Sequence, residues 1–117
     1  MQAMRVSIFI NENDRWRGRA LHLELLRALG KAGIAGATVV RGVAGYTRSA
    51  GISTTSLVDA GGTLPLVVEF IDEEQHIVGI LPQIIAMVGN RLITTTPTEI
   101  RHGGAFGARD SNADEVA

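Results

Sequence analysis

Cysteine is absent from the 117-residue chain, which excludes disulfide bonds, thiol nucleophiles and metal sites built on thiolates. The eleven basic residues include a single lysine, Lys31, and it does not follow a glycine-rich phosphate loop. This excludes a Walker-type nucleotide site. No apolar run approaches the roughly 18 residues that span a bilayer, and the N-terminus lacks the pattern of a secretory signal. These absences predict a cytoplasmic protein that is not inserted in a membrane.

The rest of the composition is that of a single folded domain. Apolar residues make up 45% of the chain and aromatic residues 4%, and the formal net charge is −1. A chain without a basic excess lacks the electrostatic footprint of a nucleic-acid-binding protein, so no such partner is expected. We expect the domain to cover residues 1–102, and residues 103–117, rich in glycine, alanine and aspartate, to form a flexible tail.

Hydrophobic periodicity predicts four strands and two helices. Alternation with a period of two indicates strands at residues 4–12, 37–42, 64–72 and 91–101. The first helix begins at Arg19 and ends at Gly33, and the second opens with a capping-box pattern at residues 72–75 and ends at Gly89. The order strand, helix, strand, strand, helix, strand (βαββαβ) predicts an α+β, ferredoxin-like domain, in which both helices cover one face of a four-stranded antiparallel sheet.

The connection after the second predicted strand, residues 44–62, is long and rich in glycine, serine and threonine. It has no apolar periodicity, and connections longer than roughly 12–15 residues are usually functional or disordered in compact domains. We expect residues 46–56 to be mobile until a partner or ligand orders them.

Both faces of the predicted sheet carry apolar residues, although two helices can cover only one face. Phe9, Val67 and Ile71 lie on the face opposite to Ile8 and Val68. Strands that are apolar on both faces are usually buried on both, and a large exposed apolar face is an association site. The sequence therefore predicts a homo-oligomer that buries the second face.

Residues 40–45 (VRGVAG) lead from the second predicted strand into the long connection and resemble the start of the mobile T-loop in the PII signalling superfamily. The chain is most similar to a small PII-like family that is known only as a domain of unknown function. The matching segments fall between residue 5 and about residue 101, and they are residues 13–18 (NDRWRG), 33–42 (GIAGATVVRG), 64–65, 68–72 and 81–82.

This resemblance implies a homotrimer of ferredoxin-like subunits. In the better-known relatives, nucleotides bind in clefts between subunits, and the T-loop changes shape to contact a membrane transporter or an enzyme. Members of the similar small family are often encoded beside fluoride exporters, which implies a role connected with transport. The implied ligand is an adenine nucleotide or a related metabolite, and the implied function is regulatory rather than enzymatic.

The resemblance also selects candidate ligand-binding residues, because glycine backbone N–H groups and arginine side chains both bind phosphate. They lie at the base of the T-loop, at the turn that corresponds to the B-loop of PII proteins, and near the end of the last strand: Arg41, Gly42, Gly45, Gly89, Arg91 and Arg101. The residues that would face a partner from the loop are Tyr46, Arg48 and Gly51.

Other polar residues are weaker candidates. Trp16, in a polar loop between two arginines, either stacks on a nucleobase or covers the end of the core, and the second interpretation is favoured. The three histidines lack metal-ligand spacing, so we expect no metal site. No nucleophile or positioned histidine accompanies the carboxylates Glu12 and Asp14, so we expect no catalytic site. The alternative function is a small ferredoxin-fold enzyme of acylphosphatase type, in which Arg15 and Asn13 would hold a phosphate and a water.

Overall fold

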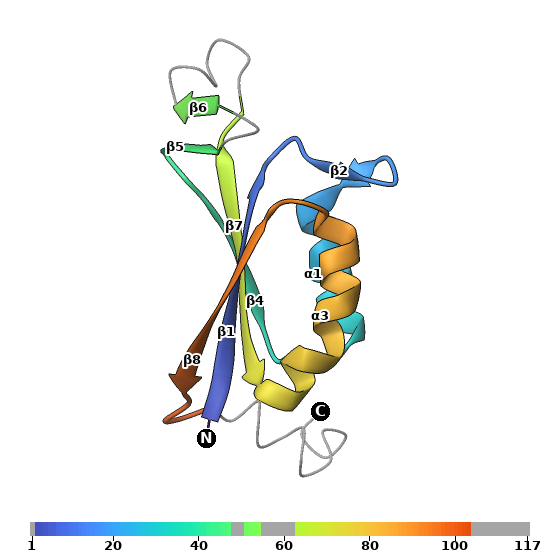
Figure 1. The fold of residues 1–117 in the computed structure, drawn as a ribbon, viewed down its shortest axis with the longest axis vertical. Coiled ribbons are helices and arrows are strands. Elements are labelled where there is room, and N and C mark those ends of the chain that lie inside the picture. The colour runs from blue at the N-terminus through green and yellow to red at the C-terminus, as the bar shows by residue number, and fades with distance from the viewer. Residues whose placement is uncertain (1, 48–50, 55–62, 104–117) are drawn as a thin grey trace.

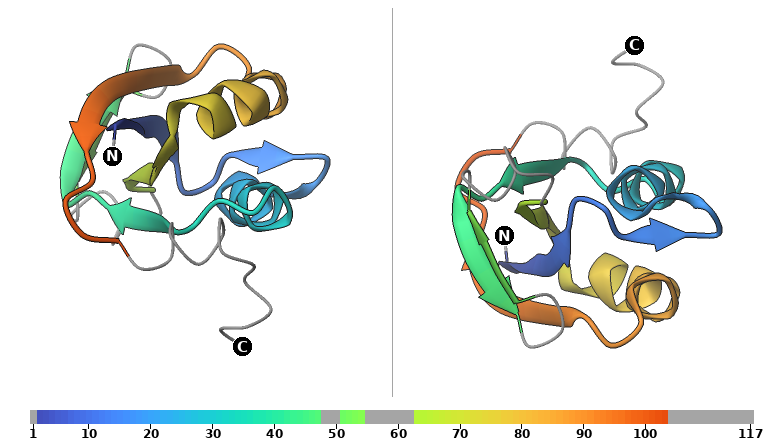
Figure 2. Two further views of the ribbon diagram at one scale, coloured as in Figure 1. Left: turned by 90° about the horizontal axis from the view of Figure 1, so that it is seen from below. Right: turned by 90° about the horizontal axis from the view of Figure 1, so that it is seen from above.

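The computed structural model describes residues 2–47, 51–54 and 63–103. Its main sheet has the strand order β4–β7–β1–β8, with every neighbouring pair antiparallel. The four strands are β1 (Gln2–Asn11), β4 (Ala37–Arg41), β7 (Pro65–Glu73) and β8 (Leu92–Glu99). Both helices, α1 (Leu21–Lys31) and α3 (Glu74–Val88), lie on the same side of this sheet (Figures 1 and 2). The predicted ferredoxin-like α+β fold is confirmed.

The core lies between the sheet and the two helices. Alternate residues of β1 and β7 point toward the helices and are buried, because a strand turns successive side chains to opposite faces. The register pairs Val6 with Phe70 and Ile8 with Val68, so the apolar positions of both strands coincide. The largest fully buried side chains of this layer and of the helices are Phe70, Ile8, Leu21, Leu25, Leu29, Ile77 and Ile84.

The ends of the helices are fixed by local chemistry. Gly33, the predicted end of the first helix, has a φ of +76°, which glycine adopts without strain. Helix α3 ends at Gly89, with a φ of +64°. β8 is an edge strand, which suits Pro97 because proline has no N–H for a further neighbour.

The second helix begins differently from the sequence-based expectation. The N-cap residue of α3 is Glu73, and Asp72 does not take that position. Asp72 instead points into the interior and is fully buried. Its Oδ2 lies 2.9 Å from Nδ1 of His76, and Nε2 of His76 lies 2.7 Å from the carbonyl oxygen of Ala32. This chain of contacts joins the end of α1 to the start of α3. It also supplies the polar partner that the burial of Asp72 requires.

Two small hairpins were not predicted. Three of their strands lie in segments that the sequence indicates as loops, and the fourth covers residues 19–20, where the sequence predicts the start of the first helix; that helix begins at Leu21 instead. β2 (Arg15–Trp16) pairs with β3 (Arg19–Ala20) through a two-residue turn in which Arg17 and Gly18 both have positive φ. β5 (Ala44–Thr47) pairs with β6 (Gly51–Thr54). The expectation of an irregular connection over residues 44–62 is therefore wrong for these two strands, whose backbone groups pair with each other despite the lack of an apolar pattern. Residues 48–50 and 55–62 lie outside the described residues, as does most of the expected tail.

No helix in the described ranges combines the length and the apolar character needed to cross a bilayer.

Candidate functional site

Arg41, Glu12 and Leu64 meet at what we call the hairpin end of the sheet, where β1 and β4 finish and β7 is about to begin. Arg41 contacts Glu12 through two nitrogens, with Nε 3.0 Å from Oε2 and Nη2 3.2 Å from Oε1. Oε1 of Glu12 also accepts the backbone N–H of Leu64 at 2.9 Å. The Arg41 side chain remains 55% exposed, against 23% for Glu12. An accessible guanidinium therefore lies at the base of the β5–β6 hairpin.

The surroundings of Glu12 favour its ionised form. The hydrogen bond from the Leu64 N–H lowers the pKa of Glu12 below its ordinary value of 4.5, and the Arg41 guanidinium lowers this pKa further. The charge of His22 in α1 acts in the same direction. The Nδ1 atom of His22 is buried, with no hydrogen-bond partner among the described residues.

The sequence did not place Glu12 or His22 among the ligand-binding residues. A signal for Glu12 was present, because it continues the even-numbered series of inward-facing positions that runs through Ile8 and Ile10. A charged residue at the end of such a series needs a partner at the edge of the core.

Gly42 and Gly45 allow the chain to pass close to Pro65. The N–H of Gly42 donates to the carbonyl oxygen of Pro65 at 2.8 Å. A Cβ atom at Gly42 would lie 3.0 Å from Cγ of Pro65, and one at Gly45 would lie 3.1 Å from it. The two glycines thus have a packing role, and in this conformation the Gly42 N–H is not available to a phosphate.

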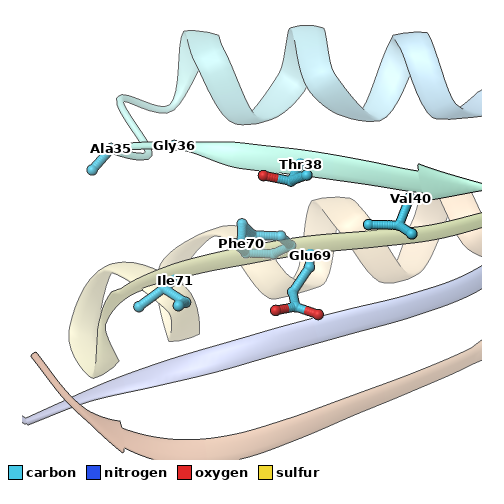
Figure 3. A pocket seen from close by; sticks show the side chains of 7 residues that line it. All are labelled: Ala35, Gly36, Thr38, Val40, Glu69, Phe70 and Ile71. Carbon is cyan, nitrogen blue, oxygen red and sulfur yellow. The ribbon is translucent and has the colours of Figure 1, made fainter.

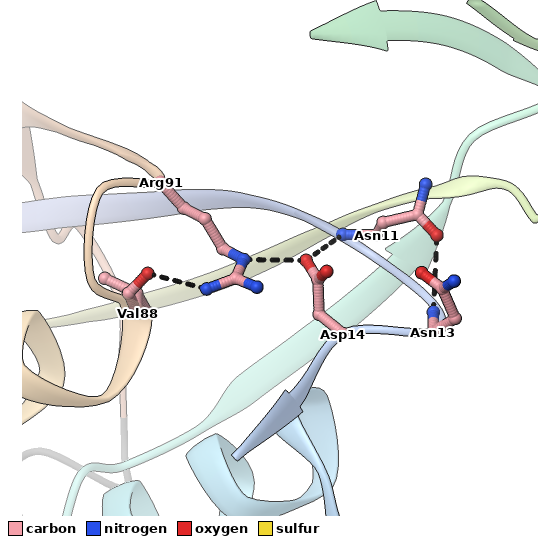
Figure 4. Close-up of polar contacts among 5 residues, drawn as sticks. All are labelled: Asn11, Asn13, Asp14, Val88 and Arg91. Carbon is pink, nitrogen blue, oxygen red and sulfur yellow. Dashed lines mark hydrogen bonds and ion pairs between the residues drawn. The ribbon is translucent and has the colours of Figure 1, made fainter. Parts of the chain in front are cut away.

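Arg91 also lies at the hairpin end, but its contacts are internal. Its Nε donates to Oδ2 of Asp14 at 2.8 Å, and its Nη1 donates to the carbonyl oxygen of Val88 at 3.0 Å (Figure 4). The same Asp14 oxygen accepts the backbone N–H of Asn11 at 2.8 Å. Arg91 thereby ties the turn after α3 to the loop after β1.

The remaining predicted ligand residues do not gather around Arg41 within one chain. Gly89 ends α3 in a backbone conformation that other residues rarely adopt. Arg101 follows β8 at the opposite end of the sheet, where its side chain is 85% exposed and lies 3.9 Å from Glu99. Because β8 runs antiparallel to β1, residues beyond its end are remote from Glu12.

Of the residues predicted to face a partner, the structure describes Tyr46 and Gly51. Tyr46 lies in β5 and is 77% exposed. Gly51 begins β6, where it pairs with Thr47. Arg48 lies outside the described residues.

Trp16 packs against the hydrophobic core, as the favoured interpretation of the sequence states. The guanidinium carbon of Arg17 lies 4.4 Å from the centroid of its ring. Trp16 therefore covers the end of the core that lies beside β2, and Arg17 covers the ring.

The sheet face away from the helices carries an apolar row across all four strands. The register places Val40 opposite Val67, Val67 opposite Phe9, and Phe9 opposite Leu92. Val40 is 52% exposed and Leu92 is 60% exposed. We call these four residues the apolar row.

An open groove of about 390 Å³ lies beside the apolar row, between β4 and β7 (Figure 3). Its wall is mostly apolar, and Glu69 is the single charged residue among those that line it. The groove and the apolar row together form a surface whose chemistry suits contact with another protein surface.

Comparison with known proteins supports the assignment of this fold. Residues 3–100 match the DUF190 family, described as "Uncharacterized ACR". The UPF0166 protein of Aquifex aeolicus is 37% identical over 93 residues, which cover 80% of this chain and 88% of that protein. UPF0166 protein MJ1524 of Methanocaldococcus jannaschii is 27% identical over 107 residues, which cover 91% of this chain and 98% of that protein.

Solved structures of CPII, a nitrogen regulatory PII-like protein from Thiomonas intermedia K12, have the same fold. The structure bound to ADP, AMP and bicarbonate superposes with a TM-score of 0.58 at 16% identity, covering 91% of this chain and 94% of that one. The structure bound to ADP, AMP and acetate gives a TM-score of 0.59 at 13% identity, covering 90% and 94%. The predicted resemblance to a family of unknown function is confirmed, and the fold is that of a PII-like protein.

Proposed function

Because the chain belongs to the DUF190 family, within the PII-like superfamily, we propose that it is a regulatory protein that binds an adenine nucleotide. In this proposal the protein is a cytoplasmic homotrimer, the nucleotide binds between subunits, and the β5–β6 hairpin and the residues around it contact a transporter or an enzyme. Residues 1–102 form the working domain, and the protein is not itself an enzyme.

The exposed guanidinium of Arg41 carries the proposal. It lies at the end of β4 and directly before the hairpin, so a phosphate bound there would touch the element that is proposed to meet the partner. Arginine suits this task because its planar fork makes two parallel, charge-assisted hydrogen bonds to a phosphate. The structures of CPII with ADP and AMP make an adenine nucleotide the first ligand to test.

The apolar row supports assembly into an oligomer. Val40, Val67, Phe9 and Leu92 form a continuous band on the face that the helices leave uncovered. Burying this band against another copy would remove apolar area from water. Each Å² of apolar area buried would stabilise the assembly by about 25 cal/mol.

Calorimetric titration with ADP, ATP and AMP tests the nucleotide proposal. We expect saturable binding to the wild-type protein and a loss of at least tenfold in affinity for Arg41→Ala, since a charge-assisted hydrogen bond contributes about 1.5–3 kcal/mol. Arg27→Ala is the matched control, because Arg27 pairs with Glu24 on α1 and is 60% exposed. Equal losses in both variants, or no binding by the wild-type protein, would contradict the proposal.

Sedimentation of the wild-type protein and of Val40→Glu tests the assembly. We expect a trimer for the wild-type protein and dissociation for the variant, because a carboxylate in the apolar row would be desolvated in the interface. A wild-type monomer at micromolar concentration would remove the intersubunit site.

A further inference from the structure

Glu12 occupies the edge of Arg41 that a phosphate would use. The contacts of Nε with Oε2 and of Nη2 with Oε1 form the fork arrangement in which a guanidinium holds a carboxylate. A phosphate binds the same planar edge in the same way. While Glu12 holds these two nitrogens, a phosphate can reach only the rest of the guanidinium.

Glu12 is the fixed member of this pair. Its own N–H donates to the carbonyl oxygen of Leu64 at 3.1 Å, and its Oε1 accepts the Leu64 N–H at 2.9 Å. These two hydrogen bonds hold Glu12 on the segment before β7, whether or not Arg41 is present. Within the described residues the Arg41 side chain makes no second contact of this kind, and it is the more exposed of the two. Arg41 is therefore the partner that can move.

Movement of Arg41 acts directly on the base of the hairpin. Arg41 is the last residue of β4, and the next residue, Gly42, is bonded to Pro65 through its N–H. Gly42 and Gly45 both lie close to the Pro65 ring, with no room for a larger side chain at the present spacing. A shift of Arg41 away from Glu12 would first displace Gly42 and Gly45 relative to the Pro65 ring.

We propose that the Glu12 carboxylate competes with the phosphate of the ligand for Arg41 and so closes the binding site of the free protein. This inference rests on the proposed function. When a phosphate takes over the Nε and Nη2 edge, Glu12 stays on Leu64, and the Arg41 side chain no longer ties the end of β4 to Glu12. Binding is thereby coupled to the position of the β5–β6 hairpin, and Glu12 sets how much negative charge a ligand must bring in order to compete.

The apparent affinity equals the intrinsic affinity multiplied by the fraction of molecules in which Arg41 is free, so the competition lowers it. Removing the charge of Glu12 should therefore tighten phosphate binding. Glu12→Gln is the appropriate change, because its amide oxygen can still accept the Leu64 N–H while its attraction for Arg41 is much weaker. From the usual strength of a half-exposed ion pair we expect ADP to bind about three- to tenfold more tightly.

The experiment titrates ADP into the wild-type protein, Glu12→Gln and the control Glu24→Gln at one fixed ionic strength. Glu24 pairs with Arg27 on α1, so its change removes the same charge without touching the site. Amide exchange at Gly42 supplies a second measurement. We expect it to be faster in Glu12→Gln than in the wild-type protein without ADP, and to rise in the wild-type protein when ADP is added.

The outcomes separate this inference from the proposed function. Tighter binding by Glu12→Gln alone supports the competition. Wild-type binding that is unchanged or weakened in Glu12→Gln overturns it and leaves the proposed function in place. If the wild-type protein binds no ADP, the proposed function is overturned, and this inference is overturned with it. If Glu12→Gln does not fold, Glu12→Asp replaces it. Its carboxylate keeps the charge but is one methylene shorter and reaches Arg41 less well, so tighter ADP binding is again expected.

Discussion

The charged side chains at the two ends of the sheet differ in their exposure to solvent. At the helix-junction end, where β7 passes into α3, Asp72 is fully buried and contacts His76, which in turn reaches Ala32. At the hairpin end, Glu12 and Arg41 form an ion pair in which both side chains remain in contact with solvent. The first cluster joins two helices, and the second lies beside a hairpin.

The difference follows from the cost of exchanging partners. A buried carboxylate that loses its partner is left in a medium of low dielectric constant, so the helix-junction cluster has one stable arrangement. An exposed pair contributes little to stability, and water or another anion can replace either member at small cost. Of these two clusters, only the one at the hairpin end is therefore suited to ligand exchange.

The largest expected effect is at the helix-junction end. Asp72→Ala removes the buried carboxylate and leaves His76 without its Oδ2 partner. We expect a loss of about 3–5 kcal/mol in the free energy of unfolding, measured by urea denaturation. Glu99→Ala is the control, because Glu99 is exposed and should change stability by less than about 0.5 kcal/mol. Similar small losses in both variants would remove the distinction between the two ends.

The second effect tests whether packing holds the base of the hairpin. Gly42→Ala would place a Cβ atom 3.0 Å from Cγ of Pro65, which forces the chain apart. We expect a loss of about 1–3 kcal/mol in unfolding free energy. Gly36→Ala is the matched control, because a Cβ atom there meets nothing within 4 Å. If the two glycine variants have the same stability, close packing is not what positions the hairpin.

The third effect asks whether Arg91 belongs to the fold or to the ligand site. Arg91→Ala deletes the hydrogen bonds to Asp14 and Val88, so we expect a loss of about 1–2 kcal/mol in stability. ADP affinity should be unchanged in calorimetric titration. Arg101→Ala, which removes an 85% exposed side chain, should leave stability unchanged. A stable Arg91→Ala protein that no longer binds ADP would show that Arg91 belongs to the ligand site.

The sequence predicts the main sheet well because its strands and helices differ in hydrophobic period. The even positions 4–10 of β1 and 66–70 of β7 are apolar, so alternation identifies both strands. It does not predict β5 and β6, because residues 44–54 carry no apolar alternation and these two strands pair only through their backbones. Asp72 is misread as an N-cap, because sequence spacing alone does not reveal that its side chain points inward to His76.

The candidate site was predicted only in part, for a related reason. Arg41 is found through its resemblance to a T-loop motif, but Glu12, its partner, is 29 residues distant in the chain. Sequence separation hides such a pair until the fold brings β1 and β4 to the same end of the sheet. Arg91 shows the converse, since its arginine fork is satisfied by Asp14 and Val88 within the fold.

The smallest expected effect concerns the pH dependence of the Glu12–Arg41 pair. The pKa of Glu12 is lowered from 4.5, first by the Leu64 N–H and then by Arg41. A carboxyl group whose pKa is lower in the folded than in the unfolded protein contributes stability above its unfolded pKa and loses it as the pH falls through the folded pKa. The charge of Glu12 therefore stabilises the protein at neutral pH and ceases to do so in acid.

Thermal unfolding of the wild-type protein and of Glu12→Gln at a series of pH values measures this contribution. The Tm of the wild-type protein should exceed that of the variant by a constant small amount from neutral pH to about pH 5. The difference should shrink as the pH falls below 4.5, because protonated Glu12 and glutamine then carry the same charge. Glu24→Gln again serves as the control, because it removes a carboxylate that pairs with an arginine elsewhere, on α1. A difference that grows in acid would mean that Glu12 is destabilised by its surroundings, and the contrast between the two ends would then rest on Asp72 alone.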